Sequence, residues 1–113
     1  MANFNPDHKA VLDGMLLGHP AVREGKMFGF PAYYVGKNLC ICLYEQGVGV
    51  KLPENIVAQM LKNDTNVIPF QPYGKPKMRE WVQINLSDSA DYQQYEAVFL
   101  KAIDTLMAKQ KKG

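Results

Sequence analysis

The spacing of apolar and polar residues along the chain predicts three helices and four strands. Apolar residues recur at helical spacing in 5–20, 53–64 and 89–108. Apolar and polar residues alternate, or run as short β-branched and aromatic stretches, in 32–35, 39–44, 47–52 and 79–86. Asn5 followed by Pro6 is typical of a helix start, and Pro53 marks the start of the second helix.

Short connections between the strands predict an antiparallel sheet. Gly36-Lys37-Asn38 and Glu45-Gln46 are of hairpin length, and the three prolines of 66–77 favour an edge strand or a loop there. We therefore expect an α+β fold in two layers, with an antiparallel sheet of about four to five strands and three helices, in the order α-β-β-β-α-β-α. Residues 1–113 would form a single domain with a frayed basic tail at 108–113.

The alternation also divides the sheet into two faces. Leu39, Ile41 and Leu43 share one face, which would pack on the helices, whereas the opposite face stays open and carries Lys51 together with a half-apolar patch. A protein partner, including a second copy in a homodimer, would bury such a patch. The candidate partner surface consists of Cys40, Cys42, Tyr44, Trp81 and Gln83. The alternative is that the segment "PFQPYGKPK" (69–77) folds over this face.

A formal net charge of +2 is too small to indicate nucleic-acid binding by itself. Cations are nevertheless interleaved with tyrosines and Trp81 in the strands and loops, a combination that can neutralise phosphates and stack bases. The candidate anion or nucleic-acid contacts are Lys26, Lys37, Lys51, Lys75, Lys77 and Arg79. The alternative is that these lysines protect strand edges while the aromatic residues fill the core.

Catalytic and metal motifs are not recognisable. Gly29 and Gly36 enclose six residues and Lys37 is followed by Asn38, so the stretch does not match a phosphate-binding P-loop. Cys40 and Cys42, even with His8 and His19, do not have the spacing of a zinc site, and nothing nearby would activate either thiol. We expect no catalytic residues, no metal and no cofactor.

The glycines and lysines of "GKMFGFPAYYVGK" (25–37) have a simpler interpretation. Gly25, Gly29 and Gly36 would serve turns that lead into the sheet. Three Gly-Lys pairs raise the further hypothesis that Lys26, Lys37 and Lys75 converge on an anion. With no signal peptide, no membrane-length apolar run and two cysteines two residues apart, we expect a cytoplasmic protein with reduced thiols.

Two longer stretches resemble the N-terminal domain of the TfoX/Sxy competence regulators. The first is "MFGFPAYYVGKNLCICLYEQGVGVKLP" (27–53) and the second is "PFQPYGKPKMREWVQI" (69–84). The matching pieces are Met27-Phe28-Gly29, Gly36-Lys37, Lys51-Leu52-Pro53, Pro69-Phe70, Pro72, Gly74-Lys75, Met78 and Glu80-Trp81, in this order. The resemblance covers about residues 20 to 86.

This resemblance implies an α+β fold of the MmcQ/YjbR-like kind and no catalytic motif. Full-length members carry a second, helical domain and switch on DNA-uptake genes together with the cyclic-AMP receptor protein. The expectation for this chain is a stand-alone, non-enzymatic domain of regulatory, protein-binding function. The alternative is a weak nucleic-acid-binding module that uses the loop lysines and sheet aromatics.

Overall fold

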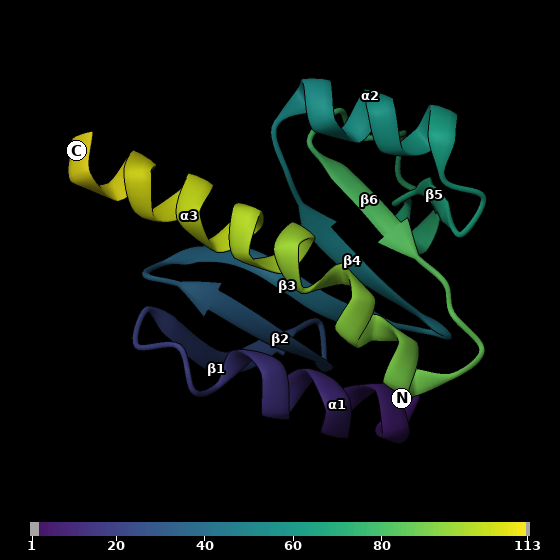
Figure 1. The fold of residues 1–113 in the computed structure, drawn as a ribbon, viewed down its shortest axis with the longest axis horizontal. Coiled ribbons are helices and arrows are strands. Elements are labelled where there is room, and N and C mark those ends of the chain that lie inside the picture. The colour runs from purple at the N-terminus through teal and green to yellow at the C-terminus, as the bar shows by residue number, and fades with distance from the viewer. Residues whose placement is uncertain (1–2, 113) are drawn as a thin grey trace.

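The computed structural model describes residues 3–112, which form one antiparallel sheet with helices on one of its faces (Figure 1). The helices are α1 (Pro6–Leu16), α2 (Glu54–Asn63) and α3 (Glu96–Lys112). The strands are β1 (Val22–Met27), β2 (Phe30–Val35), β3 (Asn38–Tyr44), β4 (Gly47–Lys51), β5 (Val67–Pro69) and β6 (Trp81–Ile84). Their order across the sheet is β1-β2-β3-β4-β6-β5. The predicted α+β class, three helices and antiparallel sheet are confirmed.

The sheet has six strands, and the prediction of four to five was too low. The missed strand is β1, whose sequence VREGKM carries three charges and a glycine instead of an alternating pattern. It forms an outer edge and pairs with β2 alone, so its side chains need little apolar character. Gly25 therefore lies inside a strand and not in a turn, and the Tyr34 ring occupies the space that a side chain would need there.

The proline-rich passage does contain a strand, because β5 pairs with β6 at the opposite edge of the sheet. Beyond Pro69 the chain leaves the sheet, forms a single 3-10 turn at Pro72–Gly74 and returns to it at Trp81.

The last helix also differs from its prediction at both ends. Residues Ser89–Tyr95 form a 3-10 helix, and α3 then runs to Lys112, beyond Ala108, within the predicted basic tail. Gly113, the last residue of that tail, lies outside the described residues.

The helix-side face of the sheet holds the larger core. Leu12 of α1, Val57 of α2 and Phe99 of α3 are buried in one cluster with Ile41 and other strand residues. A buried contact joins the start of α1 to the 3-10 helix, where the His8 ring packs edge-on against Tyr92. All three helices therefore depend on the same sheet face, and no helix within residues 3–112 covers the other face.

A β-bulge in β3 changes the predicted division of the two faces at Leu39 and Cys40. Tyr33 pairs with Ile41 but Tyr34 pairs with Leu39, so Cys40 is an extra residue in the ladder. The bulge breaks the alternation at this point. Cys40 lies in the helix-side core and Leu39 on the opposite face, the reverse of what simple alternation predicts. Cys42 keeps its predicted position on the face without helices.

That second face is closed by the segment between β5 and β6, the alternative that the sequence left open. Phe70 is buried in a cluster with Phe30, Ala32, Cys42 and Tyr44. Its ring lies directly on Gly49, where an added Cβ would come within 3.0 Å of both Phe70 Cζ and Cys42 Sγ. Gly49 is therefore required by close packing, and this contact anchors the covering segment to the sheet.

Burial makes both thiols poor nucleophiles. Cys40 and Cys42 are free but almost entirely inaccessible, and burial raises the pKa of each to about 12. Relative to the ordinary thiol pKa of 9.0, this lowers the reactive thiolate about a thousandfold near neutral pH. We expect neither thiol of the native protein to react with Ellman's reagent on the timescale of minutes, and both to react in denaturant. Rapid modification of one thiol in the native protein would contradict this description.

Replacing Gly49 with alanine should destabilise the protein by about 1–3 kcal/mol, because the new methyl group overlaps Phe70 and Cys42. Gly14→Ala is the matched control. Gly14 is exposed in α1 with no atom near its missing Cβ, so the alanine should stabilise by about 0.5–1 kcal/mol.

Urea denaturation of the two variants measures both effects. In a double-mutant cycle, Gly49→Ala should cost less stability in a Phe70→Leu background than in wild type if the clash is with the Phe70 ring. Equal and small effects at both glycines would show that Phe70 does not rest on Gly49.

Candidate partner-binding surface

Two exposed aromatic residues stand on the covered face of the sheet, and both have an unusual backbone. Phe28 is 69% exposed and Tyr73 is 59% exposed. Their φ angles are 51° and 56°, in the left-handed region that glycine and asparagine favour. Each is followed by a glycine that is also left-handed, Gly29 at 87° and Gly74 at 73°. Two aromatic-glycine turns therefore occur where asparagine-glycine would be ordinary.

The two turns come from distant parts of the chain and meet at the surface. Phe28 and Tyr73 pack edge to face with their ring centroids 5.8 Å apart. The Lys75 ammonium lies 5.6 Å from the centroid of the Phe28 ring. The backbone N–H of Tyr73 donates a hydrogen bond of 3.1 Å to the Tyr44 hydroxyl, which belongs to the buried cluster below. We call Phe28, Tyr73 and Lys75 together the aromatic surface.

A hollow of about 170 Å³ lies beside these residues. Most of its wall is apolar, and its one charged residue is Lys75. The hollow is lined by Met27, Phe28, Leu39, Phe70, Pro72, Lys75, Met78 and Trp81. Small-molecule sites usually enclose about 300–1,000 Å³, whereas a cavity of about 150 Å³ accommodates a benzene ring. The hollow is therefore sized for one large apolar side chain.

The residues predicted to form a partner surface lie mainly beneath this one. Cys42, Tyr44 and Gln83 are buried inside the chain, and Cys40 is in the opposite core. Trp81 alone is half-exposed, and it packs against Phe70 with ring centroids 5.4 Å apart. The predicted face is correct for Cys42, Tyr44 and Trp81, but their own chain covers it, so the accessible surface is made by the covering residues.

The six predicted cations do not form one site. Lys26 and Lys37 are near opposite ends of the β1–β2 hairpin, since Lys26 pairs with Pro31 and about 13 Å of extended strand separates Pro31 from Val35, just before Lys37. This register does not favour the hypothesis that Lys26, Lys37 and Lys75 converge on an anion. The Lys51 ammonium lies 3.4 Å from a Glu80 carboxylate oxygen and 5.9 Å from the centre of the Trp81 ring.

The remaining cations point to two different places. Lys75 is part of the aromatic surface. Lys77 and Arg79 line a separate hollow against α2, together with Glu54. Met78, between Lys77 and Arg79 in the sequence, lines both this hollow and the one beside Lys75. Arg23, which the sequence reasoning did not select, extends over the Tyr34 ring at 5.2 Å.

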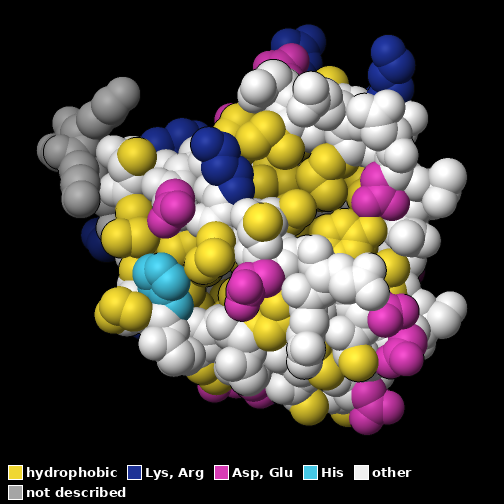
Figure 2. Space-filling view, in the orientation of Figure 1, with side chains coloured by type: hydrophobic (Ala, Val, Ile, Leu, Met, Phe, Trp, Pro, Cys, Tyr) yellow, Lys and Arg dark blue, Asp and Glu magenta, His cyan; other side chains and the backbone are white. Residues whose placement is uncertain are grey.

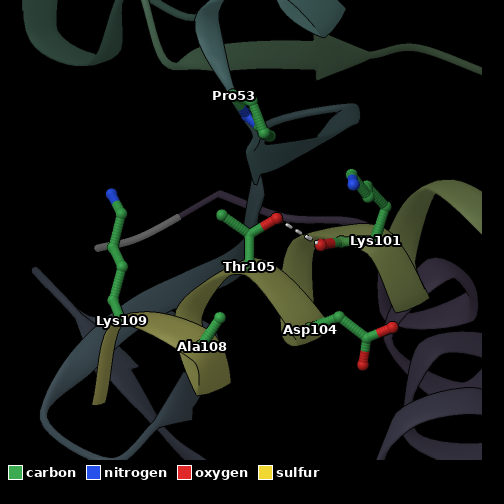
Figure 3. A pocket seen from close by; sticks show the side chains of 6 residues that line it. All are labelled: Pro53, Lys101, Asp104, Thr105, Ala108 and Lys109. Atoms are coloured by element: carbon green, nitrogen blue, oxygen red, sulfur yellow. Dashed lines mark hydrogen bonds between the residues drawn. The ribbon is translucent and has the colours of Figure 1, made fainter. Parts of the chain in front are cut away.

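The helix side of the molecule has a larger hollow, but its polar groups are spread apart. Figure 2 shows apolar side chains gathered between α2 and α3. A hollow of about 390 Å³ lies between Pro53 and α3 (Figure 3). The Thr105 hydroxyl there donates a hydrogen bond of 2.8 Å to the Lys101 carbonyl oxygen, and the Asp104 carboxylate points away from Pro53. The polar groups of this hollow do not converge on a point where a ligand atom would sit.

Sequence reasoning missed Phe28 and included Tyr73 only as one of several aromatic residues. The signal was present in "MFGF" and "PYGK", where a large aromatic residue precedes the glycine of a turn. Within residues 3–112, no cluster of three or more metal-binding side chains occurs. Over the same residues, no helix has the length and apolar character needed to cross a membrane.

Comparisons with protein-family models, with curated proteins and with solved structures found no match to this chain.

Proposed function

We propose that this chain is a small, non-enzymatic regulatory domain that binds another protein through the aromatic surface. The resemblance to the N-terminal domain of TfoX/Sxy regulators supports this proposal, because the Phe28-Gly29 and Gly74-Lys75 turns belong to the motifs that carry the resemblance. Both cysteines are buried free thiols, which suits a cytoplasmic protein.

The observation that carries the proposal is that Phe28 and Tyr73 are exposed to solvent although each has a strained, left-handed backbone. A left-handed conformation costs a residue with a side chain on the order of 1 kcal/mol, which glycine would avoid. In the isolated chain both rings are largely exposed, so burial of apolar surface does not offset this backbone cost. Two such residues in contact with each other, beside an apolar hollow, match the aromatic anchors at the centre of protein interfaces.

Nucleic-acid binding is the second candidate, favoured by the position of Lys75 over the Phe28 ring. Its weakness is geometric. The Phe28 and Tyr73 rings are nearly perpendicular, at 89°, and so do not offer parallel faces to successive bases. Phosphate binding also needs several converging cations, whereas Lys75 lines one hollow, Lys77 and Arg79 line another, and Lys51 lies against Glu80.

The double variant Phe28→Asn/Tyr73→Asn tests the proposal. Asparagine tolerates the left-handed backbone, so we expect the free energy of unfolding to stay within about 1 kcal/mol of wild type. Proteins captured from a lysate of the cells that make this protein should be lost with the double variant, as measured by quantitative mass spectrometry. A partner that is a second copy would appear in light scattering as a dimer that becomes monomeric in this variant.

Leu100→Gln is the matched control, because Leu100 is a 42% exposed apolar residue on α3, in the helix layer. This variant should capture the same proteins as wild type. Capture that depends on Leu100 and is unchanged by the Phe28 and Tyr73 substitutions would place the binding surface on the helices and contradict the proposal.

A further inference from the structure

The hollow beside Phe28 and Tyr73 has a composition that specifies the chemistry of its occupant. Seven of its eight lining residues are apolar, and the eighth is Lys75. No acidic residue lines it. The nearest acid in sequence, Glu80, is already within 3.4 Å of the Lys51 ammonium and 3.9 Å of the Lys109 ammonium.

Lys75 is the cation of this site that has no carboxylate partner among the described residues. Its ammonium lies over the Phe28 ring, and the side chain as a whole is exposed. A cation–π contact at an exposed position is weak and leaves the ammonium able to pair with an incoming anion. The three positive charges of 71–79 are not balanced by any acid within that segment.

We propose that the hollow receives one large apolar side chain, of phenylalanine or leucine size, from a partner protein whose neighbouring carboxylate pairs with Lys75. This inference rests on the proposed protein-binding function and specifies its partner. The volume of about 170 Å³ accommodates one ring and is too small for a typical cofactor. The single lysine at its rim matches one carboxylate and does not match a polyanion, which needs several phosphate contacts.

The site is also prepared before binding. The turn at Tyr73-Gly74 is fixed by the hydrogen bond to the Tyr44 hydroxyl, and the floor is fixed by Phe70 on Gly49. A preformed hollow keeps the ordering cost of binding low, so a short segment with one anchor and one charge is enough for specific recognition.

A library of random 12-residue peptides displayed on phage is the probe. Selection on wild-type protein should enrich peptides that carry a Phe or Leu within two residues of an Asp or Glu. Binding of the enriched peptides, measured by fluorescence anisotropy, should weaken at least about tenfold on Lys75→Glu, as expected for loss of a charge pair and its replacement by repulsion. Selection on the Lys75→Glu variant should in turn enrich Lys or Arg beside the same apolar anchor.

Lys101→Glu is the control, because it makes the same charge change at an exposed lysine of α3 and should leave peptide affinity unchanged. Enriched peptides that lose binding in Phe28→Asn/Tyr73→Asn but show no acidic preference and no effect of Lys75→Glu would overturn this inference while leaving the proposed function standing. Peptides that are insensitive to both changes, or an empty selection, would overturn both.

A 20-nucleotide oligothymidine tests the alternative that the surface binds single-stranded nucleic acid. The inference predicts that it neither binds with an affinity that depends on Lys75 nor displaces the selected peptides. Displacement of the peptides by oligothymidine, with loss on Lys75→Glu, would assign the surface to single-stranded nucleic acid and overturn the peptide proposal.

Discussion

The contact of the Phe70 ring with the bare backbone of Gly49 determines what the second face of this sheet becomes. The sheet has helices on one face only, and its other face would otherwise expose Phe30, Cys42 and Tyr44. Because Gly49 has no side chain, the Phe70 ring can reach the sheet and hold the segment that follows β5 against it. The apolar floor, the closed face and the position of Tyr73 all follow from this contact.

The same contact explains how an exposed surface can be rigid. Tyr44 is packed against Phe70 with ring centroids 5.6 Å apart, and its hydroxyl holds the Tyr73 backbone. Tyr73 in turn supports Phe28, which comes from the first hairpin of the sheet. A chain of aromatic contacts therefore connects the buried core to the two exposed rings, and it allows both to keep a left-handed backbone that an isolated turn would relax.

The sequence was sufficient to predict the layers but not the details that make the site. Helical periodicity predicted the three helices, and short apolar, β-branched and aromatic runs predicted the four inner strands β2, β3, β4 and β6. The charged edge strand β1 has no such run, and its identity depends on pairing with β2. The bulge at Cys40 could not be predicted either, since it depends on the register between β2 and β3.

The candidate site was predicted in part for the same reason. The correct sheet face was chosen for Cys42, Tyr44 and Trp81, but the partner that covers them is Phe70, a residue 28 positions after Cys42 in the chain. Whether a proline-rich loop folds back is decided by a tertiary contact and not by local propensity. The aromatic-glycine turns, in contrast, are local, and a search for large residues before turn glycines would have found both.

Partner binding through the aromatic surface, as proposed, requires that this surface is preformed in solution. The most direct measurement is the hydrogen exchange of the Tyr73 amide, followed by NMR on the free wild-type protein together with contacts between the Phe28 and Tyr73 ring protons. We expect the Tyr73 amide to exchange at least about tenfold more slowly than an unstructured amide, because it is hydrogen-bonded and ordered, and we expect direct contacts between the two rings. An amide that exchanges at the unstructured rate, with no contact between the two rings, would show that the covering segment is not anchored and would contradict the account.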